Sequence, residues 1–176
     1  HVLNSYEYNE RQARFIRTSY DISESLQHQV NLAIKTLEMN ERYFATSEQV
    51  NANDFRAFND GVLTEDSGIY GLAWIPKVTR DEREEFEFAL RAQGYKDFTI
   101  KQRHNIGDMD VADDHEVYFP IAYTIPYSRN EKAHGFDVYA DDPVIDYSRR
   151  HLLDFARDNG KVIATPMFPI VQAESQ

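Results

Sequence analysis

The first 45 residues have the hydrophobic pattern of one long helix. Residues 5–45 contain no Gly or Pro and are rich in Glu, Gln, Arg, Leu and Ala, which favour helix. Such a helix is roughly 60 Å long at about 1.5 Å per residue. The pairs Leu26/Ala33 and Val30/Leu37 are seven residues apart, as in a coiled-coil seam. The pattern predicts either pairing with a second copy along a seam of Leu26, Val30, Ala33 and Leu37, or an amphipathic helix on its own domain.

Short apolar runs alternate with helix signals in the rest of the chain. Helices are predicted to begin near Asn53, after the T-x-x-E box of Thr79 and Glu82, and at Pro143. The predicted strands are 69–78, 98–103, 117–127, 135–139 and 162–165, with an acidic loop at 105–114 and a hairpin turn at 129–132. The order predicts an α+β fold, in which a long N-terminal stalk helix (1–52) precedes a module of antiparallel sheet with flanking helices (53–176).

Charge and cysteine content exclude several classes of partner and site. The 176 residues carry a formal net charge of −11, which disfavours nucleic acid and anionic membrane surfaces. There is no Cys, which rules out disulfides, thiolate metal sites and a Cys nucleophile. No apolar run approaches the length of a membrane span. Any membrane contact is therefore expected through flanking spans outside this chain.

The sequence lacks the motifs of common catalytic and metal sites. The six His residues do not form H-E-x-x-H or H-x-H pairs, and the acidic run 108–116 lacks the order of a calcium loop. No G-x-S-x-G, P-loop or G-x-G-x-x-G motif occurs. We predict no catalytic residues, no metal and no cofactor.

Four separated segments resemble the CHASE domain family. They are GLAWIPKVTRDEREEFE at 71–87, YFPIAYTIPYSRN at 118–130, GFDV at 135–138 and ARDNGKVIATP at 156–166. The resemblance implies a periplasmic or extracellular sensor, held between two membrane spans of receptor histidine kinases, diguanylate cyclases or adenylate cyclases. It also implies PAS-like modules on antiparallel sheet, and dimers. Family members usually continue past the equivalent of Thr165 and Pro166, so a C-terminally truncated sensor region is expected.

A ligand pocket is predicted among the apolar strands. Gly71, Ala73 and Ala122 are small residues beside large neighbours, which leaves volume for a ligand or, alternatively, permits tight packing of a helix on the sheet. The candidate polar anchors are Trp74, Tyr118, Tyr123 and Thr165.

Two carboxylates are further candidates for ligand contacts. Asp137 lies between Phe136 and Val138, and Glu116 lies at the start of the strand that contains Tyr118. Either would select amines or other N–H donors. The alternative for Asp137 is a bond to an Arg or to backbone amides. Cytokinin-binding members of the CHASE family contact their ligand through a carboxylate, but that contact does not map onto one residue here.

The leading interpretation is the ligand-sensing domain of a transmembrane receptor, either a histidine kinase or a diguanylate cyclase. It would bind an unidentified small molecule and signal through its terminal helices as a homodimer. One alternative is a solute- or partner-binding domain without a signalling role. Another is an acidic hydrolase that uses an unrecognised carboxylate pair.

Overall fold

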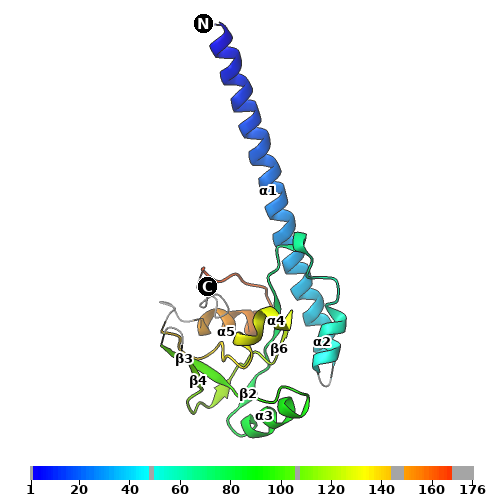
Figure 1. Cartoon of the computed structure of the whole chain (residues 1–176), viewed down its shortest axis with the longest axis vertical. Coiled ribbons are helices and arrows are strands. Elements are labelled where there is room, and N and C mark those ends of the chain that lie inside the picture. Colours follow the sequence, from blue (N-terminus) through cyan, green and yellow to red (C-terminus); the bar gives the residue numbers. More distant parts are fainter. Residues whose placement is uncertain (1, 48–49, 106–107, 144–148, 168–176) are drawn as a thin grey trace. The chain divides into compact units, whose positions relative to one another are not determined.

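A computed structural model describes residues 2–47, 50–105, 108–143 and 149–167 (Figure 1). The chain divides into two compact units. The first consists of residues 1–48 with 64–69, and the second of residues 49–63 with 70–176. The fold is mixed α+β, with a long N-terminal helix followed by small antiparallel sheets and helices, as predicted.

The first unit is built on helix α1 (Val2–Ala45), which confirms the predicted long helix. The segment 64–69 contains the short 3-10 helix η1 (Glu65–Ser67). It is held to α1 by Gln29, whose Nε2 donates to the carbonyl oxygen of Asp66 at 3.4 Å. Most apolar side chains between Tyr8 and Leu37 are exposed on α1, so this helix has an apolar surface that its own unit leaves open.

The second unit contains the remaining helices, which begin and end at recognisable signals. They are α2 (Ala52–Phe58), α3 (Arg83–Ala92), α4 (Tyr127–Asn130), the 3-10 helix η2 (Glu131–Ala133) and α5 (Arg150–Asn159). The Asn51 side chain caps α2, because its oxygen accepts hydrogen bonds from the backbone N–H groups of Asn53 and Asp54. Glu82 Oε2 accepts bonds from both the backbone N–H and the hydroxyl of Thr79, which confirms the predicted contact before α3. These bonds lower the pKa of the Glu82 carboxyl.

Three antiparallel strand pairs form the sheet structure. The strands are β1 (Leu72–Trp74), β2 (Val78–Thr79), β3 (Lys101–Asn105), β4 (Asp108–Val111), β5 (Val117–Tyr118) and β6 (Tyr123–Ile125). β1 pairs with β6, β2 with β5, and β3 with β4. The two strands β5 and β6, which follow each other in the chain, therefore pair with β2 and β1 respectively.

The segment 135–138 connects these strand pairs. Lys101 pairs with Phe136 in a parallel bridge, and Pro120 pairs with Asp137 in an antiparallel one. Gly135 makes the close approach possible, because a Cβ there would lie 2.3 Å from the carbonyl oxygen of Thr99 and its φ is +86°. The segment thus joins β3 to the chain between β5 and β6.

Several predicted strands and turns differ from the structure. The strand predicted at 69–78 is split into β1 and β2, with Pro76 between them. The predicted acidic loop at 105–114 contains β4, which pairs with β3. The predicted hairpin turn at 129–132 is helical, within α4 and η2. Residues 162–165 form no strand, because no neighbouring strand pairs with them in the described part of the chain.

The helix predicted to begin at Pro143 is described from Arg150 onward. α5 begins at Arg150 and ends at Gly160, whose left-handed conformation (φ +56°) is the helix stop that the sequence predicts. The predicted core positions Val144 and Tyr147 lie outside the described residues.

Candidate functional site

A cavity of about 340 Å³ lies in the second unit. It is lined by residues before β2, residues in and after β5, the segment following Phe136, and two arginines of α5. Its lining includes both of the carboxylates predicted from the sequence, Glu116 and Asp137. We call it the Asp137 cavity.

Asp137 is the most constrained group in this cavity. Its side chain is 1% exposed. Oδ1 accepts bonds from the backbone N–H of Phe119 at 2.8 Å and of Tyr139 at 3.0 Å, whereas Oδ2 is buried without a hydrogen-bond partner in the structure described. Burial raises the pKa of the carboxyl, although the two backbone bonds act in the opposite direction. One oxygen therefore fixes the loop, and the other keeps its capacity to accept a bond.

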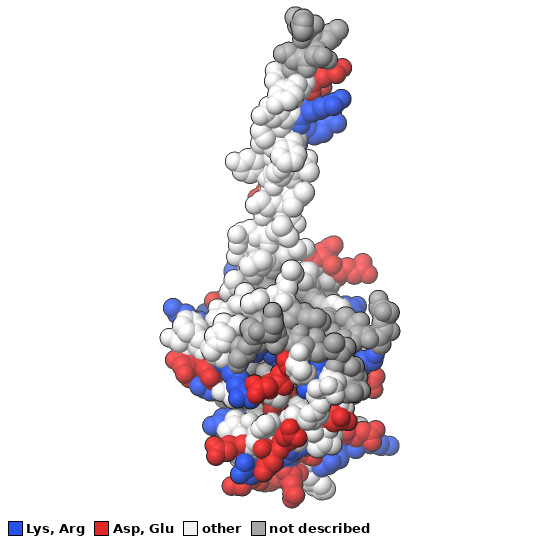
Figure 2. Space-filling model, turned by 90° about the vertical axis from the view of Figure 1, so that its left-hand side faces the viewer, with Lys and Arg blue, Asp and Glu red and all other residues white. Residues whose placement is uncertain are grey.

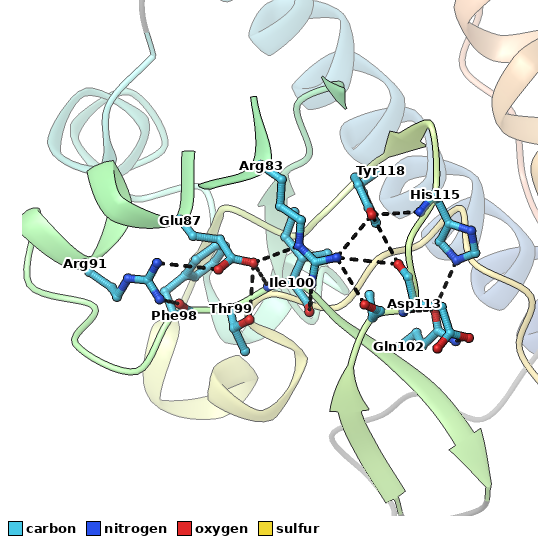
Figure 3. A network of polar contacts seen from close by, with 11 residues as sticks. Arg83, Glu87, Arg91, Phe98, Thr99, Ile100, Gln102, Asp113, His115 and Tyr118 are labelled. Carbon is cyan, nitrogen blue, oxygen red and sulfur yellow. Dashed lines mark hydrogen bonds and ion pairs between the residues drawn. The ribbon is translucent and has the colours of Figure 1, made fainter. Parts of the chain in front are cut away.

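A polar network holds the other side of the cavity in place (Figure 3). The Tyr118 hydroxyl accepts a bond from the backbone N–H of His115 at 2.8 Å and donates to the carbonyl oxygen of Asp113 at 3.1 Å. Gln102 bonds both Asp113 and the ring of His115. His115 and the exposed Glu116, both in the cavity lining, therefore lie in a segment before β5 that these hydrogen bonds hold in place.

Arg83 links this network to α3. Its Nη1 donates to the Tyr118 hydroxyl and to the carbonyl oxygen of Ala112, both at 3.1 Å. Its Nε donates to Glu87, which is nearly buried and also accepts the backbone N–H of Ile100 at 3.0 Å (Figure 3). α3 is thus bound to β3 and β5 through charge-assisted hydrogen bonds.

Basic groups complete the lining of the Asp137 cavity. Arg150 donates from Nε to the carbonyl oxygen of Tyr139 at 2.6 Å and pairs with Asp141 at 3.3 Å. Arg157 pairs with Asp154 and Asp158 on its own helix. Lys77 makes no hydrogen bond or ion pair within the described residues. Its ammonium group attracts the Glu82 carboxylate without forming an ion pair with it.

The other predicted ligand residues lie outside the Asp137 cavity, and two of them, Trp74 and Tyr123, are cross-strand partners in the β1–β6 pair. Tyr118 is fully buried, and its hydroxyl is used by the network described above. Tyr123 is also buried, and its hydroxyl donates to Gln93 at 3.1 Å. Trp74 is half-buried in β1, whereas Ala73 beside it and Thr165 are exposed. These five line neither the Asp137 cavity nor the second cavity described below.

The small residues have different surroundings from one another. A Cβ on Gly71 would lie 2.8 Å from Asn130 Nδ2, so Gly71 permits close packing of the chain before β1 on α4. Ala122 is buried, and Ala73 is exposed. The sequence predicted free volume for a ligand beside these small residues. Beside Gly71 that volume is occupied by Asn130, and beside Ala73 it is open to solvent.

Sequence reasoning missed Lys77, Tyr139 and Arg150 as cavity residues. Lys77 precedes β2 and Arg150 begins α5, so more than seventy residues separate two side chains of the same cavity. The available signal was local: Lys77 follows a Pro at the end of an apolar run. Nothing in that pattern indicates which distant segment it faces.

Clusters of metal ligands and membrane-spanning helices are both absent from the described residues. No group of three or more His, Asp or Glu side chains there could hold a metal ion. No helix in the described part of the chain is long and apolar enough to cross a bilayer.

Comparison with known protein families places most of the chain in one of them. A family model described as the CHASE domain matches residues 48–176, which is most of the chain and includes the whole Asp137 cavity. No curated protein sequence matches the chain significantly.

Proposed function

The chain belongs to the CHASE domain family of extracytoplasmic sensor domains of signalling receptors, and we propose that its ligand binds in the Asp137 cavity. CHASE domains bind small-molecule ligands, and the match identifies no catalytic domain in this chain. The observation that carries the proposal is Asp137, a residue of the cavity lining whose buried Oδ2 has no hydrogen-bond partner in the described structure.

The groups around the cavity indicate which ligand chemistry fits. Asp137 Oδ2 accepts a bond from an amine or another N–H donor, because a buried acceptor gains most from such a donor. Lys77 lines the cavity and makes no direct ion pair in the described residues, so its ammonium group favours a carboxylate or another anionic oxygen of the ligand. The proposed ligand is therefore a small polar compound with an N–H donor at one end and an acidic oxygen at the other.

The proposed signalling step uses α5. Arg150 and Arg157 lie on this helix and line the cavity, so a bound ligand contacts both the sheet and α5. A ligand shifts a conformational equilibrium only by binding one state more tightly than the other. Contacts to α5 supply such a difference when the helix has two positions. The same proposal includes an output through a kinase or cyclase domain of the parent protein. It also includes the division of the chain into a stalk, residues 1–52, and a sensor module, residues 53–176.

The proposal is tested by a thermal-shift screen of the purified domain against a metabolite library that includes amino acids, polyamines and small organic acids. A compound that binds only the folded state raises the melting temperature by mass action. Asp137→Asn retains the Oδ1 contacts but replaces Oδ2 by a donor, so it should abolish the shift. Asp60→Asn, at an exposed site outside the cavity, is the matched control and should retain it.

Two results would count against the proposal. One is a ligand whose shift is unchanged in Asp137→Asn, since this would place its binding elsewhere. The other is a parent gene without apolar segments of about 20 residues on either side of the domain, which a membrane-anchored receptor needs.

The homodimer is a separate proposal. Leu26, Val30 and Leu37 of the predicted seam are 57%, 51% and 45% exposed on α1, and Ala33 is half-buried. Exposed apolar side chains in line on one helix favour association with a second copy.

A further inference from the structure

A second cavity, of about 460 Å³, lies between the end of α3, the start of β3, and α4 with η2. It shares no lining residue with the Asp137 cavity. Its wall contains the rings of Tyr95, Phe98, Tyr127 and His134. We call it the Tyr95 cavity.

The ring of His134 contacts the three other aromatic rings of this cavity. Its ring centroid lies 4.5 Å from that of Tyr95, 4.9 Å from that of Phe98 and 5.3 Å from that of Tyr127. The side chain is 6% exposed. Nε2 lies 2.8 Å from the carbonyl oxygen of Ala122, and because a carbonyl only accepts, Nε2 must donate.

The second ring nitrogen of His134 has no partner. Nδ1 makes no hydrogen bond in the described part of the chain. Burial lowers the pKa of the imidazole, so the ring is neutral at pH 7 and Nδ1 carries a lone pair. A residue of the cavity lining therefore carries a hydrogen-bond acceptor that the protein leaves unused, on a ring in contact with three other aromatic rings.

The two tyrosines add further capacity for hydrogen bonds. Tyr95 and Tyr127 are half-buried, with ring centroids 5.7 Å apart, and neither hydroxyl is bonded within the residues described. By contrast, the neighbouring Tyr123 hydroxyl is satisfied by Gln93. A hydroxyl that packing leaves unbonded beside a cavity can donate to a ligand or accept from it.

The formal charges of the residues that line the Tyr95 cavity sum to zero. Two lysines, Lys96 and Lys101, and two acids, Asp97 and Glu131, line it. The rim thus selects neither cations nor anions, unlike the Asp137 cavity. Flat aromatic ligands gain from offset or edge-to-face contact with the ring walls.

We propose that the Tyr95 cavity is a second small-molecule site, which binds a neutral planar aromatic compound with a ring N–H or hydroxyl donor. The donor bonds Nδ1 of His134, and the ring of the ligand packs against Tyr95 and Tyr127. The site is independent of the ligand proposed for the Asp137 cavity.

Indole and 1-methylindole are matched probes for this site, since the methyl group removes only the N–H donor. Each is titrated into the domain while the aromatic NMR signals of His134 and the tyrosines are followed. Indole should produce saturable shifts of the His134 ring signals, with a dissociation constant on the order of 1 mM, an ordinary affinity for so small a compound. 1-Methylindole should bind about fivefold more weakly, the ratio expected from one hydrogen bond.

Three variants test the location. Tyr127→Leu removes one aromatic wall and should weaken indole binding about tenfold. Tyr95→Phe keeps the aromatic ring and removes only the hydroxyl, so it is the variant to measure if Tyr127→Leu does not fold. It should retain indole binding within about threefold. Asp137→Asn should leave indole binding unchanged, which separates this site from the proposed sensor site. Equal binding of the two indoles, no saturation, or shifts absent from His134 would overturn the proposal.

Discussion

At the scale of single residues, the buried carboxyl of Asp137 makes the stability of the fold depend on pH. Burial raises its pKa above the ordinary value of 3.8. The folded chain therefore holds this proton more tightly than the unfolded chain. The group contributes stability below its unfolded-state pKa, and the contribution is lost as the pH rises through the folded pKa.

Asp137→Asn removes this titration and keeps the oxygen that accepts the two backbone N–H groups. We expect the difference in unfolding free energy, variant minus wild type, to increase between pH 3 and pH 7. The increase is about 1.4 kcal/mol for each unit by which the folded pKa exceeds the unfolded one. Urea denaturation at pH 3, 5 and 7 measures it, with Asp60→Asn as the exposed control. A difference that does not vary with pH would contradict the expected burial penalty.

Tyr118 offers a second test at this scale. Its hydroxyl bonds Arg83, the backbone N–H of His115 and the carbonyl oxygen of Asp113. Tyr118→Phe leaves these groups without that partner inside the protein, so we expect a loss of about 1–3 kcal/mol in unfolding free energy. Tyr20→Phe, on the exposed surface of α1, should change it by less than about 0.5 kcal/mol. Equal effects of the two variants in chemical denaturation would show that the network does not stabilise the fold.

At the scale of elements, the segment 135–138 depends on one glycine. Gly135 and Gly61 both have positive φ, +86° and +79°, but only Gly135 has a close neighbour, the carbonyl oxygen of Thr99. Gly61→Ala therefore suffers backbone strain alone, about 1–2 kcal/mol. Gly135→Ala should lose about 1–3 kcal/mol more, because the backbone must move to admit the Cβ. Denaturation midpoints compare the two, and similar losses would mean that the close approach is not rigid.

Sequence reasoning predicted elements well where local signals decide them. α1 follows from the absence of Gly and Pro over forty residues, and the end of α5 follows from Gly160. β4 was missed because Asp108 and Asp110 have low strand propensity, and its pairing with β3 decides its conformation. The same limit applies to the Asp137 cavity. A buried carboxylate is visible in the sequence as an acid between apolar residues, whereas its basic neighbours come from distant segments.

At the scale of the whole molecule, α1 carries the surface through which two chains would associate. The exposed residues Phe15, Leu26 and Leu37 are eleven apart, as are Ile22 and Ala33. No charged residue occurs between Glu24 and Lys35, and Figure 2 shows one side of α1 as a largely uncharged surface. Eleven residues correspond to about three turns of 3.67 residues, which favours nearly straight or right-handed packing over a left-handed heptad seam.

Leu26→Glu tests this surface. In a parallel pair each Leu26 faces its counterpart, so the substitution places two like charges in an apolar layer and should dissociate the dimer. Because Leu26 is 57% exposed in the single chain, the monomer should keep its fold and helix content. Sedimentation over a range of concentrations measures association, and circular dichroism measures the fold.

Asn31→Glu is the matched control, since it adds the same charge five residues further on, well away from the apolar line of α1. It should sediment like wild type. If wild type is monomeric at high concentration, or if Leu26→Glu and Asn31→Glu dissociate equally, the apolar line does not form the interface. If only Leu26→Glu dissociates, the apolar line of α1 accounts for the association of the domain, because the same charge at residue 31 leaves the pair intact.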